Sequence, residues 1–378
     1  MTRILLITTL MCATLCALAV GQEQTNDTFT AIPLSEAARY HIDFTRFFVS
    51  PEAERAQRAK LDSILKELES LKGKTTNSPQ HLDRALRLND QAQTEFYRHY
   101  VYLYLRNAIN TTDEESLKQS SALDAEMASR TAFLRHELMT LSERQLAAFV
   151  ARNPSLSSYQ FAIESARRYR PYALSLKEEE LLNAIAPNND WTAELYDKSI
   201  TQRQPTAFQR DVIAFTLTRL ASAGSRLARL HNFPDAASQA YFDSYWTKEE
   251  VDNFLTQLAQ KADLFKRYQR IRAEYLKTHN PKLVKSPRFT VDQASEIIRN
   301  ALGPLGPDYG RELSSLLDPA NGRMDIVPGA NRRRGGFSQG FIGTDSVFYS
   351  AGFTGSYNDM RILTHESTHA VHRQLMNR

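Results

Sequence analysis

The side chains most able to do chemistry are two histidines and a glutamate in the segment His365-Glu366-Ser367-Thr368-His369. Residues four apart on a helix share one face, so His365 and His369 can direct their imidazoles at a single metal ion. Glu366 is then placed to accept a proton from a water molecule bound there. The spacing predicts a hydrolytic zinc site, with His365 and His369 as metal ligands and Glu366 as the catalytic general base.

Zinc in a hydrolytic site normally takes three protein ligands, and only nine residues follow His369. We therefore expect one zinc ion per chain whose third protein ligand is not in this sequence. His372 lies one turn further along, near the same face. It could be the third ligand, but we expect it to pack the helix or to position a ligand. A metzincin motif would place glycine at 372 and histidine at 375, and the sequence has His372 and Leu375.

The simplest alternative interpretation of the motif is a pair of surface histidines on an ordinary helix. The surrounding segment favours the metal site instead. Apolar residues on both sides of the motif can pack the helix, and a glycine-rich segment precedes it. Asn358 or Asp359 is expected to cap this helix, which leaves His365 about two turns inside it. Asp359 is also a candidate for positioning the metal ligands.

Composition narrows the class of protein. The chain has 378 residues, 42% of them hydrophobic, and a formal net charge of +4. This charge is small for the length and follows no basic stripe, so we expect no nucleic-acid partner. Cys12 and Cys16 are the only cysteines. Both lie in the apolar N-terminal segment, which excludes cysteine-protease chemistry and thiolate zinc sites for a chain that has lost this segment.

The first 21 residues have the features of a signal peptide. Arg3 is followed by an apolar run from Leu5 to Val20, with small residues suited to cleavage at its end. An uncleaved membrane anchor is the alternative, but the run is short for a span. We expect an exported bacterial protein, periplasmic or secreted, without a stable membrane span after cleavage.

The pattern of glycine and proline predicts three regions. Eleven of the fourteen glycines fall between Gly303 and Gly355, whereas the preceding chain has mainly helical periodicity. Residues 96–109 are apolar or aromatic on nearly all sides and predict a buried helix, and residues 234–246 are expected to form a loop. We predict an all-α fold with a small β-hairpin just before the motif helix.

The chain is expected to divide into three parts. Residues 1–21 are a signal peptide, residues 22–198 an N-terminal helical region, and residues 199–378 a catalytic region.

The glycine-rich region contains the candidate substrate-binding residues. Residues 336–342 and 346–353 predict two short strands joined at Gly343. An edge strand beside a metal-binding helix can pair with an extended peptide, and Phe348, Tyr349 and Ser350 are the candidates for that role. The run Arg332-Arg333-Arg334 could bind a substrate carboxylate, although a solvated loop is the simpler interpretation.

The stretch PGANRRRGGFSQGF…SVFYSAGFTGSYNDMRILTHESTHAVH resembles the thimet oligopeptidase and oligoendopeptidase F family of zinc metallopeptidases. The family pattern is P-G-x-x-x-x-G-G/A, a strand, a T-G-T-x-N-D-like turn, and T-L-x-H-E-[FL]-G-H-A-x-H. The matching positions are Pro328, Gly329, Gly335, Gly336, Thr354, Gly355, Asn358, Asp359, Leu363, His365, Glu366, His369, Ala370 and His372. Residues 154–187 and 289–313 have a weaker likeness, in the same order as in the family.

The resemblance implies a helical fold with a deep channel that admits short, unfolded peptides. It implies zinc bound by His365 and His369 with Glu366 as general base, while the third ligand is a glutamate on a later helix of the family. Ser367 and Thr368 depart from the family pattern, in which a hydrophobic residue and a glycine occupy these positions. The first hypothesis is an exported zinc oligopeptidase whose chain is incomplete. The alternatives are a pseudopeptidase that binds peptides without cleaving them, and a helical scaffold with an accidental motif.

Overall fold

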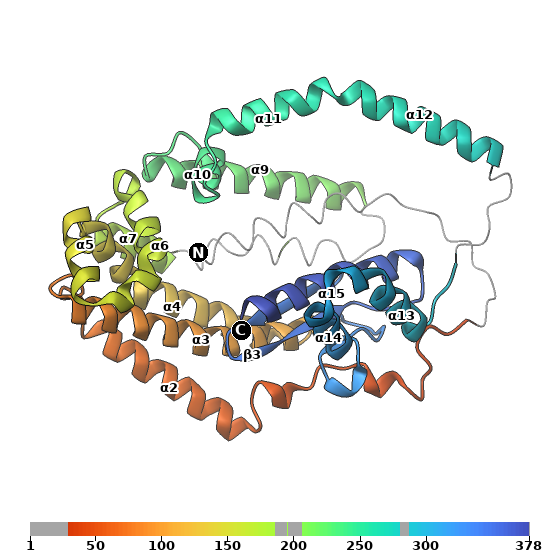
Figure 1. The fold of residues 1–378 in the computed structure, drawn as a ribbon, viewed down its shortest axis with the longest axis horizontal. Coiled ribbons are helices and arrows are strands. Elements are labelled where there is room, and N and C mark those ends of the chain that lie inside the picture. The colour runs from red at the N-terminus through yellow and green to blue at the C-terminus, as the bar shows by residue number, and fades with distance from the viewer. Residues whose placement is uncertain (1–28, 186–194, 196–205, 280–286, 378) are drawn as a thin grey trace. The chain divides into compact units, whose positions relative to one another are not determined.

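The computed structural model describes residues 29–185, 195, 206–279 and 287–377, and these are mainly helical (Figure 1). The predicted fold class is confirmed. The α-helices are α2 (Pro51–Glu69), α3 (Pro79–Ile109), α4 (Glu114–Thr140), α5 (Glu143–Arg152), α6 (Gln160–Arg168), α7 (Leu176–Ile185), α9 (Ala207–Leu230), α10 (Ala236–Asp243), α11 (Lys248–Gln260), α12 (Ala262–His279), α13 (Val291–Leu302), α14 (Pro307–Leu316) and α15 (Tyr357–Met376). The strands are β1 (Met324–Asp325), β2 (Gly336–Phe341) and β3 (Thr344–Ser350).

The chain divides into two compact units. The first consists of Met1–Thr28 and Lys198–Lys285, and the second of Phe29–Asp197 and Ser286–Arg378. The second unit takes residues from both predicted regions, 22–198 and 199–378. The predicted signal peptide, residues 1–21, lies outside the described residues, and so do its cleavage and the boundary near 198.

Helices α9 to α12 make up the described part of the first unit. The expectation of a loop at 234–246 is wrong, because α10 occupies most of that range. Asp235 accepts a hydrogen bond from the Ser238 N–H at 2.7 Å and so caps this helix. The helix is only eight residues long, too short for a periodic apolar pattern to reveal it.

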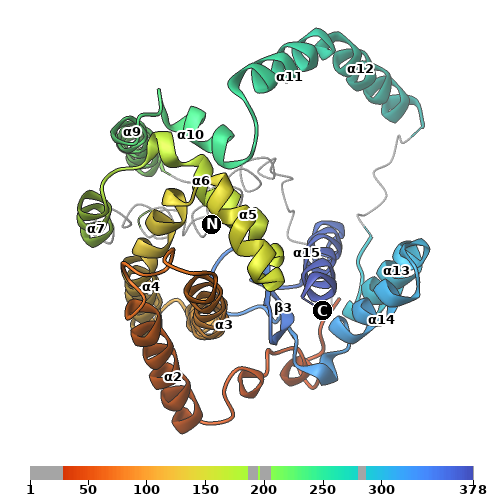
Figure 2. The same cartoon turned by 60° about the vertical axis from the view of Figure 1, so that its left-hand side comes forward.

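The N-terminal part of the second unit is a set of long packed helices, in which α3 contacts both α2 and α4 (Figures 1 and 2). The predicted buried helix at 96–109 is the C-terminal half of α3. Phe96, Leu103 and Leu105 there are almost fully inaccessible to solvent. Helix α2 begins with a Ser50 cap and Pro51 in its first turn, which favours helix initiation at that point.

A small sheet lies between these helices and the C-terminal helix in the chain order. The predicted hairpin is confirmed as β2 and β3, which pair antiparallel. Strand β1 was not expected. It pairs parallel with the other side of β3, through Met324 with Phe348 and Asp325 with Tyr349, so the strand order is β1-β3-β2.

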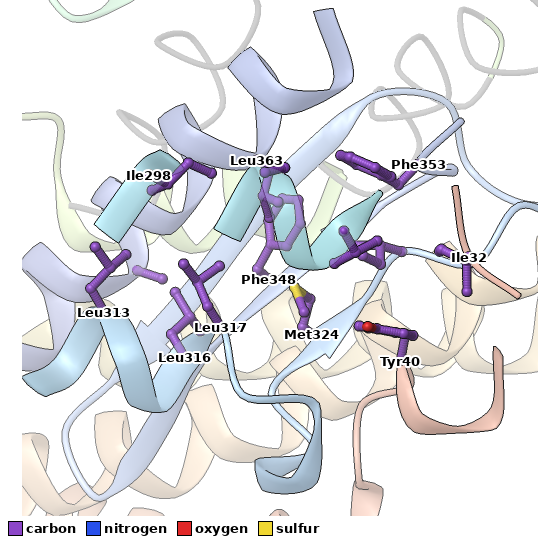
Figure 3. Close-up of a cluster of buried hydrophobic side chains, with 14 of the residues drawn as sticks. Ile32, Tyr40, Ile298, Leu313, Leu316, Leu317, Met324, Phe348, Phe353 and Leu363 are labelled. Atoms are coloured by element: carbon purple, nitrogen blue, oxygen red, sulfur yellow. The ribbon is translucent and has the colours of Figure 1, made fainter. Parts of the chain in front are cut away.

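The core that supports α15 is shared among α13, α14, β1 and β3 (Figure 3). Phe348 from β3 and Leu363 from α15 are each 1% exposed within it. This packing fixes one face of α15, since burying side chains of this size typically contributes about 1.5–3 kcal/mol each. The opposite face of α15 carries His365 and His369, both exposed.

Within the part of the chain that the structure describes, none of the helices combines the length and the apolar character needed to cross a membrane.

Candidate active site

The start of α15 is fixed by a turn that orients the whole helix. Ser356 is the N-cap, and Asp359 completes a capping box with it. The expectation that Asn358 or Asp359 caps the helix is therefore wrong by two or three residues. The Asp359 carboxylate accepts hydrogen bonds from the Thr354 N–H at 2.8 Å and the Thr354 hydroxyl at 2.7 Å. Through these hydrogen bonds, Asp359 fixes the conformation of the turn at the start of α15.

Gly355 makes this turn possible for a steric reason. Its φ is +87°, and a Cβ there would lie 2.5 Å from Cε1 of Phe29 and 2.6 Å from the Phe289 carbonyl oxygen. A side chain at this position would be strained and would also collide with backbone. Glycine is thus required where the chain enters the motif helix.

His365 and His369 bring their Nε2 atoms to 3.2 Å from each other, with the rings perpendicular. Two nitrogens bound to one tetrahedral zinc at the usual 2.0–2.1 Å would be about 3.3 Å apart. Burial lowers the pKa of His369, and the nearby His365, Arg373 and His372 act in the same direction. A lowered pKa favours the neutral imidazole, which is the form that binds metal. The pair therefore fits two of the ligands that zinc needs.

Among the residues that the structure describes, no three His, Cys, Asp or Glu side chains come together as a metal site. His372 is exposed and lies one turn beyond His369 on α15. The expected third ligand from outside this sequence stays a prediction.

Glu366, between the two histidines in sequence, faces the strand β2. Burial raises the pKa of its carboxyl group to about 7, against the opposing effects of Arg373 and of hydrogen bonds from Ser338. Both the N–H and the hydroxyl of Ser338 donate to the carboxylate. The Glu366 side chain is thus held by the protein, while the two imidazoles face solvent.

Gly336 lets β2 approach α15 this closely. A Cβ at Gly336 would lie 3.0 Å from Cγ2 of Ile362 and 3.6 Å from Cγ of Glu366. The first distance is shorter than ordinary van der Waals contact. The glycine at the start of β2 therefore sets the distance between the sheet and the side chain of Glu366.

A hollow of about 460 Å³ lies over the exposed face of α15. The residues that line it all belong to this helix: Tyr357, Met360, Arg361, Thr364, His365, Thr368 and His369. Thr368, which departs from the family pattern, faces this hollow and donates its hydroxyl to the Thr364 carbonyl at 2.8 Å. Ser367 is fully buried and satisfies its own hydroxyl through the same carbonyl at 3.1 Å. Both departures are compatible with a continuous helix.

The expectation that Phe348, Tyr349 and Ser350 lie on an edge strand is wrong. They belong to β3, which has β1 on one side and β2 on the other. Phe348 and Tyr349 are also buried, and the Tyr349 hydroxyl contacts the carbonyl oxygens of Ala108 and Arg333. The edge nearest to α15 is β2, and two side chains of α15 already bind its backbone at Ser338.

The side chain of Arg332 is only 6% exposed, although the residue itself lies in a loop. Its guanidinium donates to Asp325 at 2.5 Å and to the Ser350 carbonyl at 2.8 Å, and it stacks on the Tyr349 ring. His41 reaches the other Asp325 carboxylate oxygen at 3.2 Å. This arginine holds β1 to the end of β3, so it is not available for a substrate carboxylate.

Two residues near Glu366 were not anticipated from the sequence: Ser338 and Arg373. Arg373 follows Glu366 by seven residues, a spacing that returns to the same helix face. That spacing was the available signal for Arg373. Ser338 could not be found in this way, because its contact with α15 depends on the strand register.

Comparisons with known proteins find similarity to oligopeptidases in sequence and to peptidases in structure. A family model described as Oligopeptidase F matches residues 137–190. Oligopeptidase PepF of Bacillus subtilis is 25% identical over 86% of this chain and 56% of its own length. A crystal structure of a peptidase from Chlamydophila abortus superposes with a TM-score of 0.65, at 18% identity, over 90% of this chain and 66% of that one. The oligoendopeptidase F structure from Enterococcus faecium gives a TM-score of 0.50, at 18% identity, over 68% and 59%.

The two structural likenesses extend the agreement to the fold. The chain spans little more than half the length of the Bacillus subtilis relative. The family match at 137–190 falls in the helical region before the motif, whereas the motif itself is at 365–369. The family model therefore matches a part of the chain that does not include the motif.

Proposed function

We propose that this chain carries residues of a zinc oligopeptidase site, on the basis of its resemblance to the oligoendopeptidase F family of zinc metallopeptidases. The observation that carries the proposal is the arrangement on α15. Two imidazole nitrogens lie 3.2 Å apart on the exposed face of α15, and the carboxylate of Glu366, on the side of the helix that faces β2, is held by Ser338. Two convergent imidazole nitrogens and one oriented carboxylate are the side chains that metal-assisted hydrolysis of an amide needs.

His365 and His369 would hold the metal through Nε2. Zinc bound there would supply Lewis acidity toward a peptide carbonyl and a water molecule. Glu366 accepts a proton from the attacking water at its carboxylate and then donates that proton to the leaving amine. Ser338 keeps this carboxylate in place through two hydrogen bonds, which reduces the number of orientations it can adopt.

The proposed substrates are short, unfolded peptides. The relatives named above as an oligopeptidase and an oligoendopeptidase support this class. The exposed histidines and the hollow along α15 leave room for an extended chain near the reactive groups. We further propose that the protein is exported, on the basis of the apolar segment before residue 21.

Hydrolysis of an internally quenched peptide tests the proposal. With zinc added, the Glu366→Gln substitution should lower turnover by about 10²–10⁴-fold, because a positioned general base contributes that much. Glu296→Gln, which changes an exposed glutamate of α13 in the same way, is the matched control and should leave the rate unchanged. Equal turnover in the wild type and Glu366→Gln would reject Glu366 as the base.

A peptide-binding protein without turnover is the second candidate. It is favoured by Ser367 and Thr368, which stand where the family pattern has a hydrophobic residue and a glycine. In that case the wild type and Glu366→Gln would bind the same peptides with equal affinity, measured by fluorescence anisotropy, and neither would cleave them.

A further inference from the structure

Ser338 stands at a special point of β2, because its backbone groups are directed away from the sheet. It pairs with Phe348 of β3, and the Phe348 N–H donates to the Arg323 carbonyl on the opposite side, at 2.8 Å. Ser338 and Phe348 therefore form a non-hydrogen-bonded pair. An edge strand normally leaves such N–H and C=O groups to solvent or to another strand.

Helix α15 supplies the partners for both groups. The Ser338 N–H and hydroxyl donate to the Glu366 carboxylate. Nη1 of Arg373 donates to the Ser338 carbonyl oxygen and lies 3.4 Å from the Ser338 hydroxyl oxygen. Glu366 and Arg373 are almost two helical turns apart on one face of α15. Glu366 therefore binds the N–H of Ser338 while Arg373 binds its carbonyl group.

The network is shielded from water. Ser338 is 5% exposed, and Glu366 and Arg373 are both partly buried. Gly336 permits this close approach two residues earlier in β2. Buried hydrogen bonds that involve charged groups are stronger than exposed ones, so this contact can fix side-chain positions.

We propose that Arg373 is a positioning residue for Glu366, acting through Ser338, an inference that rests on the function proposed above. By holding the Ser338 carbonyl, Arg373 keeps this stretch of β2 in the register at which the Ser338 N–H and hydroxyl meet the Glu366 carboxylate. Arg373 does not touch the reacting atoms. Its contribution is to orient the general base, and this contribution depends on the guanidinium group at position 373.

Single-residue amide hydrogen exchange on the full chain tests the positioning role without any enzymatic readout. Arg373→Met keeps the apolar length of the side chain but removes the donor. It should make exchange at the Ser338 N–H about tenfold faster, because the contact with Glu366 loosens. The Phe337 N–H belongs to the adjacent hydrogen-bonded pair with Tyr349 and should not change. Arg373→Lys, which retains a donor, should give an intermediate rate.

Arg311→Met is the matched control, since Arg311 is an exposed helical arginine that pairs with Asp308 in α14. It should leave the Ser338 rate as in the wild type. Where peptide hydrolysis is measured, Arg373→Met should lower kcat by about 10–100-fold at unchanged KM, and Arg373→Lys should recover part of it.

The outcomes separate the two proposals. An unchanged Ser338 rate in Arg373→Met overturns the positioning role. A similar rise at Ser338 and Phe337 also overturns it, because Arg373 would then only stabilise the sheet. If Glu366→Gln has no effect on hydrolysis, the proposed function fails, while the exchange result still decides whether Arg373 controls the Ser338 contact.

Discussion

At the residue scale, burial changes what each charged side chain near the sheet can do. Arg332 and Asp325 are 6% and 1% exposed in their side chains, so each depends on the other for compensation of its charge. Arg39, by contrast, is 56% exposed and pairs with Glu36 in solvent. The two ion pairs look similar in sequence, yet their energetic roles differ.

The buried pair makes a direct prediction about stability. Arg332→Met should lower the free energy of unfolding by about 3–5 kcal/mol, because it leaves the buried Asp325 carboxylate without its main partner. Urea denaturation followed by circular dichroism measures the change. Arg39→Met should stay within about 0.5 kcal/mol of the wild type. A small effect of Arg332→Met would mean that Asp325 finds another partner, with His41 the nearest candidate.

Gly336 provides a second test at this scale. Gly336→Ala should cost about 1–3 kcal/mol of stability, because the new Cβ meets Ile362 and the Tyr349 carbonyl. The Cγ of Glu366, 3.6 Å from the added atom, would be in ordinary van der Waals contact with it. Gly310→Ala in α14 is the control: no atom lies within 4 Å there, so replacing a helical glycine should stabilise by about 0.5–1 kcal/mol. Destabilisation of equal size in both variants would contradict the steric explanation.

At the scale of elements, local sequence patterns predicted individual helices and the hairpin, but they did not predict which strands pair with each other. The buried helix at 96–109, the hairpin and the motif helix followed from periodicity, glycine position and the length of the apolar runs. The sequence did not reveal β1, whose two residues pair with a strand more than twenty positions away. For the same reason the edge of the sheet was assigned to β3 in place of β2.

The candidate site was predictable to the same extent. His365, Glu366 and His369 share a helix, so their relation follows from the helical repeat alone. Ser338 and the buried state of Arg332 depend on contacts between elements, which one sequence does not encode in a local pattern. The cap of α15 was misplaced because Ser356, Asn358 and Asp359 are all good capping residues.

The position of this cap can be measured. Ser356→Ala should destabilise the protein by about 1 kcal/mol, because the Asp359 N–H loses its acceptor at 3.1 Å. Asn358→Ala should have a smaller effect, since its side chain accepts a hydrogen bond from Arg361 at the helix surface and caps no backbone N–H of the first turn. Thermal unfolding of the two variants compares them directly. The reverse order of effects would place the start of α15 at Asn358.

At the scale of the whole molecule, the candidate metal site has to be considered together with the length of the chain relative to its relatives. The second unit contains the sheet, α15 and the packed helices α2 to α7, whereas the helices α9 to α12 belong to the first. The Bacillus subtilis relative is considerably longer than this chain. Peptide hydrolysis therefore stays a proposal for this chain, whereas metal binding by His365 and His369 can be tested on the described residues themselves.

Export is a prediction at this scale. When the full chain is produced in a bacterium, the periplasmic or secreted form should lack the residues up to Ala19 or Gly21, because small residues there suit signal peptidase. Intact mass spectrometry of the fractionated protein measures the new N-terminus. Recovery of a chain that begins at Met1 from the membrane fraction would instead indicate an uncleaved anchor.

The central claim is that His365 and His369 bind one metal ion together, and calorimetric titration of the full chain with zinc tests it most directly. The account predicts one zinc per chain in the wild type and in Glu366→Gln, and loss of that binding in both His365→Ala and His369→Ala. His279→Ala, which removes an exposed histidine of α12, should bind like the wild type. Zinc binding that survives both His365→Ala and His369→Ala would contradict the claim.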